Sequence, residues 1–134
     1  MKVLLVEDDI QLNTTITSYL ETIPFDVTSV EDGEEAIDII DDNIFDLYLI
    51  DINIPSISGL ELLKYIRQTD IHVPIIIITA SLEINNLTDA YDKGCNEYLK
   101  KPFHLKELEV RINKLIDVNP TSIKFSDNFY WLYT

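Results

Sequence analysis

Short apolar or β-branched runs recur along the chain, and helical patterns lie between them. Five runs predict strands, at residues 3–6, 27–30, 47–50, 75–78 and 97–100. The first, third and fourth runs are apolar throughout, as strands covered on both faces must be, whereas the second and fifth contain polar residues and are expected at the sheet edges. The alternation predicts an α/β fold: a doubly wound, five-stranded parallel sheet of order 2-1-3-4-5 with helices on both faces.

The segments between and after these runs carry helix signals. Asp32 with Glu35 and Ser58 with Glu61 have the spacing of a capping box, and Pro24 ends the first helical stretch. The fourth helix is the weakest pattern and bears a polar surface. Apolar residues at helical spacing are Leu12, Ile16, Tyr19 or Leu20, and Ile23; Ala36, Ile37 and Ile40; Leu60, Leu63 and Ile66; Ile84, Leu87 and Tyr91; and Leu105, Leu108, Ile112 and Leu115.

Composition limits the class of protein. A length of 134 residues with 46% apolar residues fits one soluble domain with its own core. The net charge of −14 repels nucleic-acid phosphates and anionic membranes, so direct DNA binding by this chain and membrane association are not expected. The lone Cys95 excludes an internal disulfide, and the N-terminal residues lack a signal peptide or membrane helix. We therefore expect a cytoplasmic protein.

The end of the chain differs from the rest. Residues 118–122 have the composition of a linker, and residues 123–134 alternate in polarity and contain five aromatic residues. This pattern favours a strand over a helix. The expected organisation is a domain over 1–117, a linker over 118–122 and the start of a second, truncated domain over 123–134.

Acidic residues follow two strands that the predicted order makes neighbours. Glu7, Asp8 and Asp9 follow the first strand, and Asp51 ends the third, with Asn53 two residues later. Two like charges about 4 Å apart repel by about 4 kcal/mol at an effective dielectric constant of 20, so the cluster calls for a cation. Its hard oxygen ligands favour Mg²⁺, or Mn²⁺, over zinc. The alternative is that Asp9 or Asp8 only caps the first helix.

Two further residues are expected at the same edge of the sheet. Thr79, beside the small Ala80, ends the fourth strand and offers a hydroxyl group, although a threonine there can simply cap a helix. Lys101 follows the fifth strand and is placed to pair with an anion near the metal; the alternative is a solvated surface charge.

Together these residues resemble the receiver domain of bacterial two-component response regulators. The resemblance runs from Lys2 to about Asp117, with every marker in order and at the family's spacing. It implies a regulatory domain, not an enzyme, that promotes its own Mg²⁺-dependent phosphorylation and dephosphorylation with a sensor histidine kinase as donor. The markers are Val6-Glu7-Asp8-Asp9, Asp51 with Asn53, Pro55 and Gly59, Thr79-Ala80, and Tyr98-Leu99-Lys100-Lys101-Pro102-Phe103.

The resemblance also implies residue roles. Asp51 is the expected phosphoacceptor and also belongs to the metal site. Thr79 and Tyr98 form the expected pair of switch residues, although Tyr98 is alternatively a half-buried strand aromatic. The other implied roles are metal binding by Asp8 directly, by Glu7 through water and by Asn53 through its main-chain carbonyl, and phosphoryl contacts from Lys101 and Ala80.

The C-terminal pattern resembles the first strands of the winged-helix effector domain in OmpR/PhoB-type transcription regulators. This implies that DNA is bound only through a C-terminal domain missing from this chain; the alternative is an arm that packs on the receiver or a neighbour. The subfamily also implies a homodimer through the fourth helix, fifth strand and fifth helix. Glu97, Glu107 and Arg111 fit its charge pairs, whereas Leu87, Asn96 and Val118 replace charged residues. Leu87 is expected to make an apolar contact in that interface, and Glu107 can alternatively pair with Arg111 within one helix.

Three other classes fit less well. A Mg²⁺-dependent phosphohydrolase with an aspartyl nucleophile usually has a second Asp where this chain has Asn53, and it needs a substrate cap. A flavodoxin-like flavin carrier needs a phosphate-binding loop rich in Gly, Ser and Thr after the first strand, and this sequence lacks such a loop there. A degenerate receiver that only binds partners is disfavoured by the intact acidic residues and Lys101.

Overall fold

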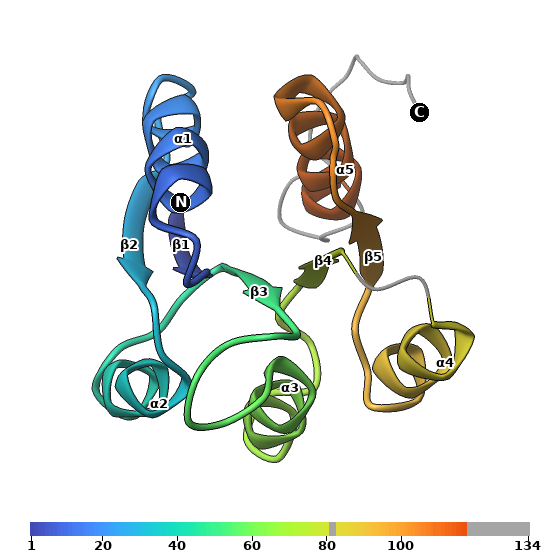
Figure 1. Ribbon diagram of the computed structural model, residues 1–134. Coiled ribbons are helices and arrows are strands. Elements are labelled where there is room, and N and C mark those ends of the chain that lie inside the picture. Colours follow the sequence, from blue (N-terminus) through green and yellow to red (C-terminus); the bar gives the residue numbers. More distant parts are fainter. Residues whose placement is uncertain (81–82, 118–134) are drawn as a thin grey trace. The chain divides into compact units, whose positions relative to one another are not determined.

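The computed structural model describes residues 1–80 and 83–117 (Figure 1). These residues belong to two units, Met1–Phe103 and His104–Thr134, and α5 belongs to the second. The predicted linker over 118–122 and the predicted strand over 123–134 lie outside the described residues. The elements in chain order are β1 (Lys2–Val6), α1 (Ile10–Glu21), β2 (Asp26–Val30), α2 (Gly33–Asp42), β3 (Leu47–Asp51), α3 (Gly59–Arg67), β4 (Ile75–Thr79), α4 (Ile84–Asp92), β5 (Glu97–Lys100) and α5 (Leu105–Asp117).

The five strands form one parallel sheet in the order β2-β1-β3-β4-β5, which confirms the predicted fold class and edge strands. Each strand begins and ends within one residue of its predicted bounds. In the register, Val6 lies opposite Val30 of β2 and Ile50 of β3. The residues that follow β1 and β3 therefore leave the sheet side by side at its carboxyl edge.

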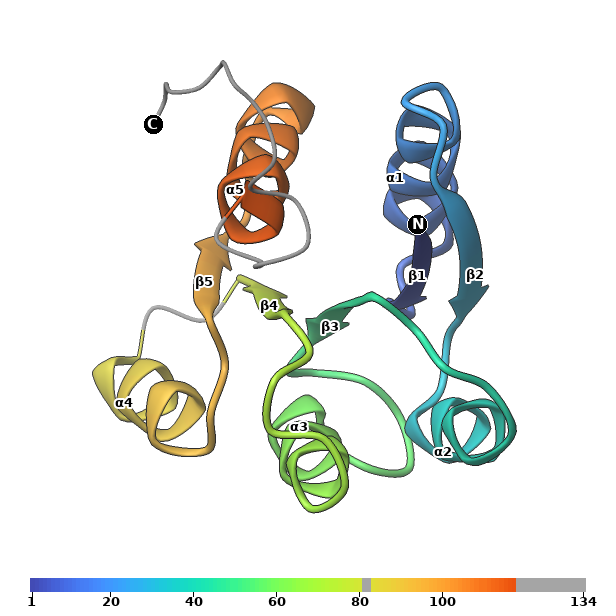
Figure 2. The ribbon, with the colours of Figure 1, turned by 180° about the vertical axis from the view of Figure 1, so that it is seen from behind.

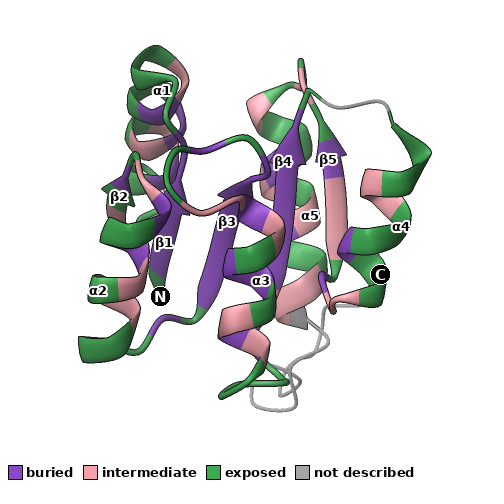
Figure 3. Cartoon of the chain, turned by 60° about the horizontal axis from the view of Figure 1, so that its bottom comes forward, coloured by how far each residue is buried: buried purple, intermediate pink, exposed green. Residues whose placement is uncertain are grey.

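Within the first unit, helices cover both faces of the sheet. Figures 1 and 2 show α1 on one face and α2, α3 and α4 on the other. The central strands are buried, apart from the first residue of β1, whereas β2 and β5 are partly exposed (Figure 3). Burial of Val, Leu and Ile side chains on both faces is the main stabilising contribution, about 1.5–3 kcal/mol for each one fully buried.

Side-chain caps fix where the first three helices begin. Asp9 accepts hydrogen bonds from the main-chain N–H groups of Gln11 and Leu12, as the capping alternative for Asp9 predicted. Ser58 and Glu61 form the complete capping box of α3. Asp32 caps α2 by accepting hydrogen bonds from the N–H groups of Glu34 and Glu35. In the described part of the chain, the reciprocal bond from the Glu35 side chain, which the capping-box spacing predicts, is not formed.

The structure resolves one open alternative in the helix predictions and corrects two details. In α1, Leu20 is the buried member of the pair Tyr19 and Leu20, because Tyr19 is only half-buried, and the helix ends at Glu21, before Ile23. In α4 the small Ala90 is buried, whereas Ile84 and Tyr91 are exposed. The short helix α4 thus buries Ala90, its smallest apolar side chain, and its larger apolar side chains remain at least partly in contact with solvent.

Thr79 is not a helix cap. The N-cap of α4 is Glu83, which makes no side-chain capping bond, and Thr79 is the last residue of β4. In α5, Leu108 and Ile112 are buried, and Leu105 and Leu115 are partly buried, at the spacing that predicted the helix. Among the described residues, no helix is both long and apolar enough to cross a membrane.

Gly59 lets α3 begin against the end of β3. Its N–H group donates to the carbonyl oxygen of Ile52 at 2.8 Å. A Cβ atom at residue 59 would overlap the carbonyl oxygen of Asp51 and crowd the Cα atom of Ile52. Only glycine fits this approach without moving the main chain that carries Asp51.

We predict that Gly59→Ala lowers the free energy of unfolding by about 1–3 kcal/mol, the usual cost of overpacking. Urea unfolding followed by circular dichroism measures the change. Lys64→Ala, at an exposed position of the same helix, is the control and should stay within about 0.5 kcal/mol of wild type. Equal stability of Gly59→Ala and wild type would contradict the close approach.

Candidate functional site

Three carboxylates meet at the carboxyl ends of β1 and β3. Glu7, Asp8 and Asp51 each place one oxygen within 4.8 Å of the others. Glu7 is fully buried and Asp51 is 4% exposed, whereas Asp8 faces solvent. The prediction that carboxylates from the first and third strands come together is confirmed. The third residue of the acidic run, Asp9, uses its carboxylate to cap α1.

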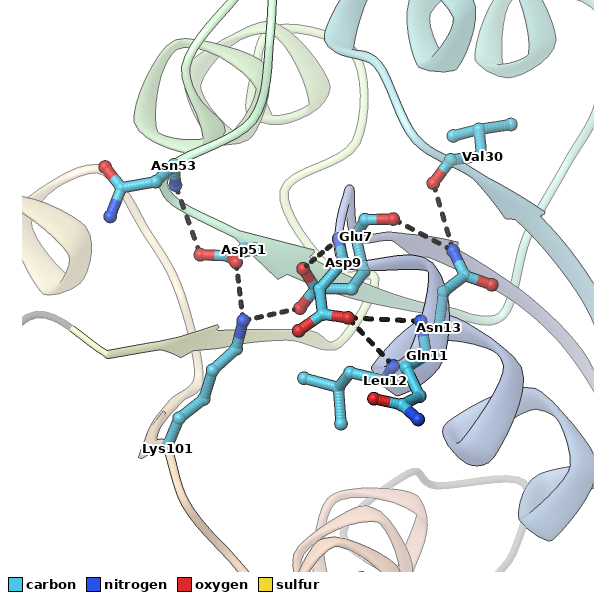
Figure 4. Close-up of polar contacts among 9 residues, drawn as sticks. All are labelled: Glu7, Asp9, Gln11, Leu12, Asn13, Val30, Asp51, Asn53 and Lys101. Carbon is cyan, nitrogen blue, oxygen red and sulfur yellow. Dashed lines mark hydrogen bonds and ion pairs between the residues drawn. The ribbon is translucent and has the colours of Figure 1, made fainter.

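Lys101 places its ammonium group between the two buried carboxylates (Figure 4). Its Nζ atom lies 2.7 Å from Glu7 Oε1 and 2.8 Å from Asp51 Oδ2. The lysine side chain is 19% exposed, so it is not the solvated surface charge that we considered as the alternative. Its main-chain N–H donates to the Thr79 carbonyl at 2.8 Å, which holds the residue beside the end of β4.

Main-chain N–H groups hold the remaining oxygens of the two buried carboxylates. Asp51 Oδ1 accepts from the N–H of Asn53 at 3.1 Å, and Glu7 Oε2 accepts from the N–H of Asp9 at 3.0 Å. Each buried carboxylate is thus held by one amide and by the ammonium of Lys101. Both side chains are fixed in direction before any ligand arrives.

Burial and charge shift the pKa values of this group in opposing ways. Desolvation raises the pKa of Glu7 above 4.5; the hydrogen bond from Lys101 opposes this effect, and the charge of Asp51 adds to it. Desolvation alone would lower the pKa of Lys101, but the hydrogen bonds and charges of Asp51 and Glu7 outweigh it and raise that pKa above 10.5. The lysine therefore stays charged throughout the neutral range.

The donor set suits a hard divalent cation. Three carboxylates and one ammonium group leave a charge of −3 + 1 = −2, which one Mg²⁺ ion would neutralise. All three donors are carboxylate oxygens, and Asp8 keeps the cluster open to solvent. Mg²⁺ usually keeps several waters when it binds carboxylates, and the exposed side of the cluster at Asp8 gives access to solvent.

The other predicted site residues lie on neighbouring elements. Thr79 is fully buried at the end of β4, and the next residue, Ala80, is exposed. Tyr98, on β5, is partly buried and packs against the core. Asn53 is exposed and donates its main-chain N–H to Asp51. The roles of these residues in phosphate binding and switching stay predictions.

The residues predicted for a dimer interface are only partly placed. Leu87 on α4 and Glu97 on β5 are partly buried in the first unit. In α5, Arg111 Nη2 lies 3.5 Å from Glu107 Oε2, so the two residues form the pair within one helix that we considered as the alternative. A dimer through these residues stays a prediction.

Sequence reasoning missed one buried polar residue at this site. Asn13 of α1 is 7% exposed and donates from its side-chain amide to the carbonyl oxygens of Glu7 and Val30. The signal was present in the spacing, because Asn13, Ile16 and Leu20 are the three buried residues of α1. A polar residue at an inward helical position next to an acidic cluster is the pattern that indicates such a contact.

Comparison with known proteins shows what this chain is similar to. The family model of the response regulator receiver domain matches residues 3–113. The transcriptional regulatory protein CiaR of Streptococcus pneumoniae is 36% identical over 128 residues, which is 96% of this chain and 55% of CiaR. The chain spans about half the length of the curated relatives it matches.

Solved structures agree with the fold. The receiver domain of the Francisella response regulator 1452 has a TM-score of 0.79 at 36% identity, covering 85% of this chain and 94% of that one. The response regulator TrrA of Thermotoga maritima, solved in complex with Mg²⁺-BeF, has a TM-score of 0.77 at 29% identity, covering 85% and 97%.

We predict that Lys101→Met lowers the free energy of unfolding at pH 7 without Mg²⁺ by about 3 kcal/mol, because two buried carboxylates lose their counter-charge. Since the pKa of Glu7 is raised, the loss should shrink as the pH falls and Glu7 takes up a proton. In wild type, the contribution of Lys101 is present below pH 10.5 and is lost as the pH rises through its higher folded pKa. Added Mg²⁺ should stabilise the variant more than wild type.

The matched control is Lys106→Met. Lys106 is 76% exposed and lies 3.3 Å from Glu109, so its loss should cost no more than about 1 kcal/mol. Urea unfolding at several pH values, with and without Mg²⁺, makes the measurement. Equal losses for the two variants would show that Lys101 does not neutralise the carboxylates.

Proposed function

Because the chain belongs to the response regulator receiver domain family, we propose that it accepts a phosphoryl group from a sensor histidine kinase on Asp51. The observation that carries this assignment is the position of Asp51: it ends β3 beside Glu7 and Asp8, and its Oδ2 atom lies 2.8 Å from Lys101. A carboxylate at this position is a nucleophile whose surroundings hold positive charge for an incoming phosphoryl group.

The transfer needs alignment and charge neutralisation more than a base. An Asp51 oxygen forms the new bond to phosphorus while the donor's bond to phosphorus breaks, and the donor group leaves with the electron pair. The N–H of Asn53 holds Oδ1 of the nucleophile, and Lys101 is within reach of the transferred oxygens. A bound Mg²⁺ supplies further positive charge beside the phosphoryl oxygens.

The acidic residues divide the binding of the metal. Asp8, the exposed member of the cluster, would be the direct carboxylate ligand beside Asp51. Glu7 would act through a water molecule, since its own oxygens are engaged by Lys101 and the N–H of Asp9. Asn53 contributes its main-chain carbonyl. The same hard-oxygen donors accept Mn²⁺ in place of Mg²⁺. The site also promotes loss of the phosphoryl group to water.

The phosphorylated site is read out by Thr79, Ala80 and Tyr98. A phosphoryl group adds negative charge and three acceptor oxygens, which attract the Thr79 hydroxyl and the main-chain N–H of Ala80. Thr79 and Tyr98 lie on neighbouring strands, with Thr79 opposite Lys100 and Tyr98 opposite Ile77. A shift of Thr79 towards the phosphate opens space into which the half-buried Tyr98 moves.

The output of the domain is control of transcription through an attached DNA-binding domain. CiaR is a transcriptional regulatory protein about half of which this chain matches. That match covers 128 of 134 residues, so it continues into residues 118–134, which supports a linker over 118–122 and the start of an effector domain over 123–134. The net charge of −14 supports DNA binding outside these residues. The cytoplasmic location stays a prediction.

Wild type incubated with Mg²⁺ and phosphoramidate should gain a single phosphoryl group, measured by intact mass. Asp51→Asn should gain none, because the amide is not a nucleophile, and should keep the circular dichroism spectrum of wild type. Asp8→Asn keeps the nucleophile and should need a higher Mg²⁺ concentration for the same rate. A phosphoryl adduct on Asp51→Asn would overturn the assignment of Asp51; no adduct on folded, Mg²⁺-bound wild type would favour a receiver that only binds partners.

Phosphorylation should also strengthen a homodimer through α4, β5 and α5. Leu87→Asp should raise the dissociation constant of that dimer about tenfold or more. A charged aspartate would replace the half-buried leucine that is expected to make an apolar contact in the interface. Sedimentation velocity with Mg²⁺ and phosphoramidate measures it. Ile44→Asp, at an 83% exposed residue between α2 and β3, is the control. The same dissociation constant for wild type and Leu87→Asp would contradict this interface.

A further inference from the structure

Asn13 of α1 joins the ends of two strands at the acidic cluster (Figure 4). Its side-chain Nδ2 group donates to the carbonyl oxygen of Glu7 at 3.0 Å and to that of Val30 at 3.4 Å. The side chain is 7% exposed. Glu7 follows β1 and Val30 ends β2, so one amide group bridges neighbouring strands at the main chain that carries the Glu7 carboxylate.

The bridge closes a small network around the residues that precede α1. The N–H of Glu7 donates to the same Val30 carbonyl at 3.0 Å. Two residues further on, Asp9 is held by its N–H on Glu7 Oε2 and by its carboxylate on the first turn of α1. Asp8 lies between these two anchors, so the direction in which its main chain leaves Glu7 depends on the carbonyl that Asn13 holds.

Packing alone does not explain an asparagine here. Asn13 occupies the same buried stripe of α1 as Ile16 and Leu20, where an apolar side chain would bury more favourably. A buried amide costs free energy unless it is hydrogen-bonded, and in this structure its N–H group has two main-chain acceptors. The residue therefore fixes the direction of the main chain at Glu7 in addition to filling space.

We propose that Asn13 is a positioning residue for the metal site: by holding the Glu7 carbonyl it sets the geometry of Asp8 against Asp51 and thereby the affinity for Mg²⁺. This inference rests on the proposed function, since it concerns the same acidic site. The role of Asn13 means that α1 contributes to the geometry of the metal ligands, in addition to the acidic residues themselves and Lys101. Asn13 itself does not touch the metal or the phosphoryl group.

The test is the Mg²⁺ dissociation constant of the full chain, obtained by titrating Mg²⁺ and following backbone amide resonances by NMR. Asn13→Ala should raise this constant about fivefold or more, because the Glu7 carbonyl loses its side-chain donor. Asn13→Ser, with one hydroxyl donor in place of the amide, should give an intermediate value and carries the test if the alanine variant does not fold. Circular dichroism at the temperature of the titration confirms that each variant is folded.

Two controls separate positioning from a general loss of stability. Thr14→Ala changes the neighbouring exposed position of α1, and Ile16→Val removes one methyl group from its buried stripe at a cost of stability. Both should bind Mg²⁺ within twofold of wild type. In phosphorylation by phosphoramidate, Asn13→Ala should need more Mg²⁺ for half the maximal rate, with a rate at saturating Mg²⁺ within twofold of wild type.

The outcomes distinguish this inference from the proposed function. Wild-type Mg²⁺ affinity in Asn13→Ala, or an equal loss of affinity in Ile16→Val, overturns the positioning role and leaves the metal site intact. A normal Mg²⁺ requirement with a reduced rate at saturation overturns it as well. Absence of any Mg²⁺ binding by wild type overturns both the positioning role and the proposed metal site.

Discussion

The ammonium group of Lys101 between Glu7 and Asp51 is the interaction on which this structure depends. Two almost fully buried carboxylates repel each other and are stabilised by a counter-charge, because the amides of Asn53 and Asp9 supply only partial compensation. The lysine neutralises one negative charge and leaves the cluster at −2. The carboxyl edge of the sheet is therefore stable enough to fold and still short of positive charge, which is the condition that favours a divalent cation.

The fold brings these groups together through strand order. β1 and β3 are neighbours although they are separated by a strand and two helices in the sequence, and parallel strands place both carboxyl ends at one edge. The close start of α3 at Gly59 fixes the main chain after Asp51. Lys101 is held by its main-chain bond to Thr79 at the end of β4. Each charged group at the edge is thus fixed by a different connection to the same rigid sheet.

Much of this arrangement follows from the sequence, because it depends on local patterns. The apolar runs predict the strands, and the polarity of residues 27–30 and 97–100 predicts the edges of the sheet. Asp51 and Lys101 are predictable because each directly follows a strand. Asn13 and the exposure of Ile84 were not predicted, since both depend on which side of a helix meets the sheet. Periodicity predicts where the inward-facing positions of a helix recur. The packed structure shows which of these positions is buried, and so whether a polar residue such as Asn13 or a small residue occupies it.

The charge balance connects this site to its proposed signal. With one Mg²⁺ bound, the charges of three carboxylates, one ammonium group and the metal would sum to zero, so the unphosphorylated site would exert little electrostatic attraction on its neighbours. Conversion of the Asp51 carboxylate to an acyl phosphate adds roughly one further negative charge and three acceptor oxygens. Lys101 can follow the new charge only by loosening its contact with Glu7 or Asp51, and the remaining oxygens attract donors from the end of β4. Because the main-chain N–H of Lys101 donates a hydrogen bond to the carbonyl oxygen of Thr79, the movement of one residue constrains the other. In the proposed function, phosphorylation of Asp51 at the end of β3 would therefore reach β4 and β5 through the same lysine that partly neutralises the acidic cluster.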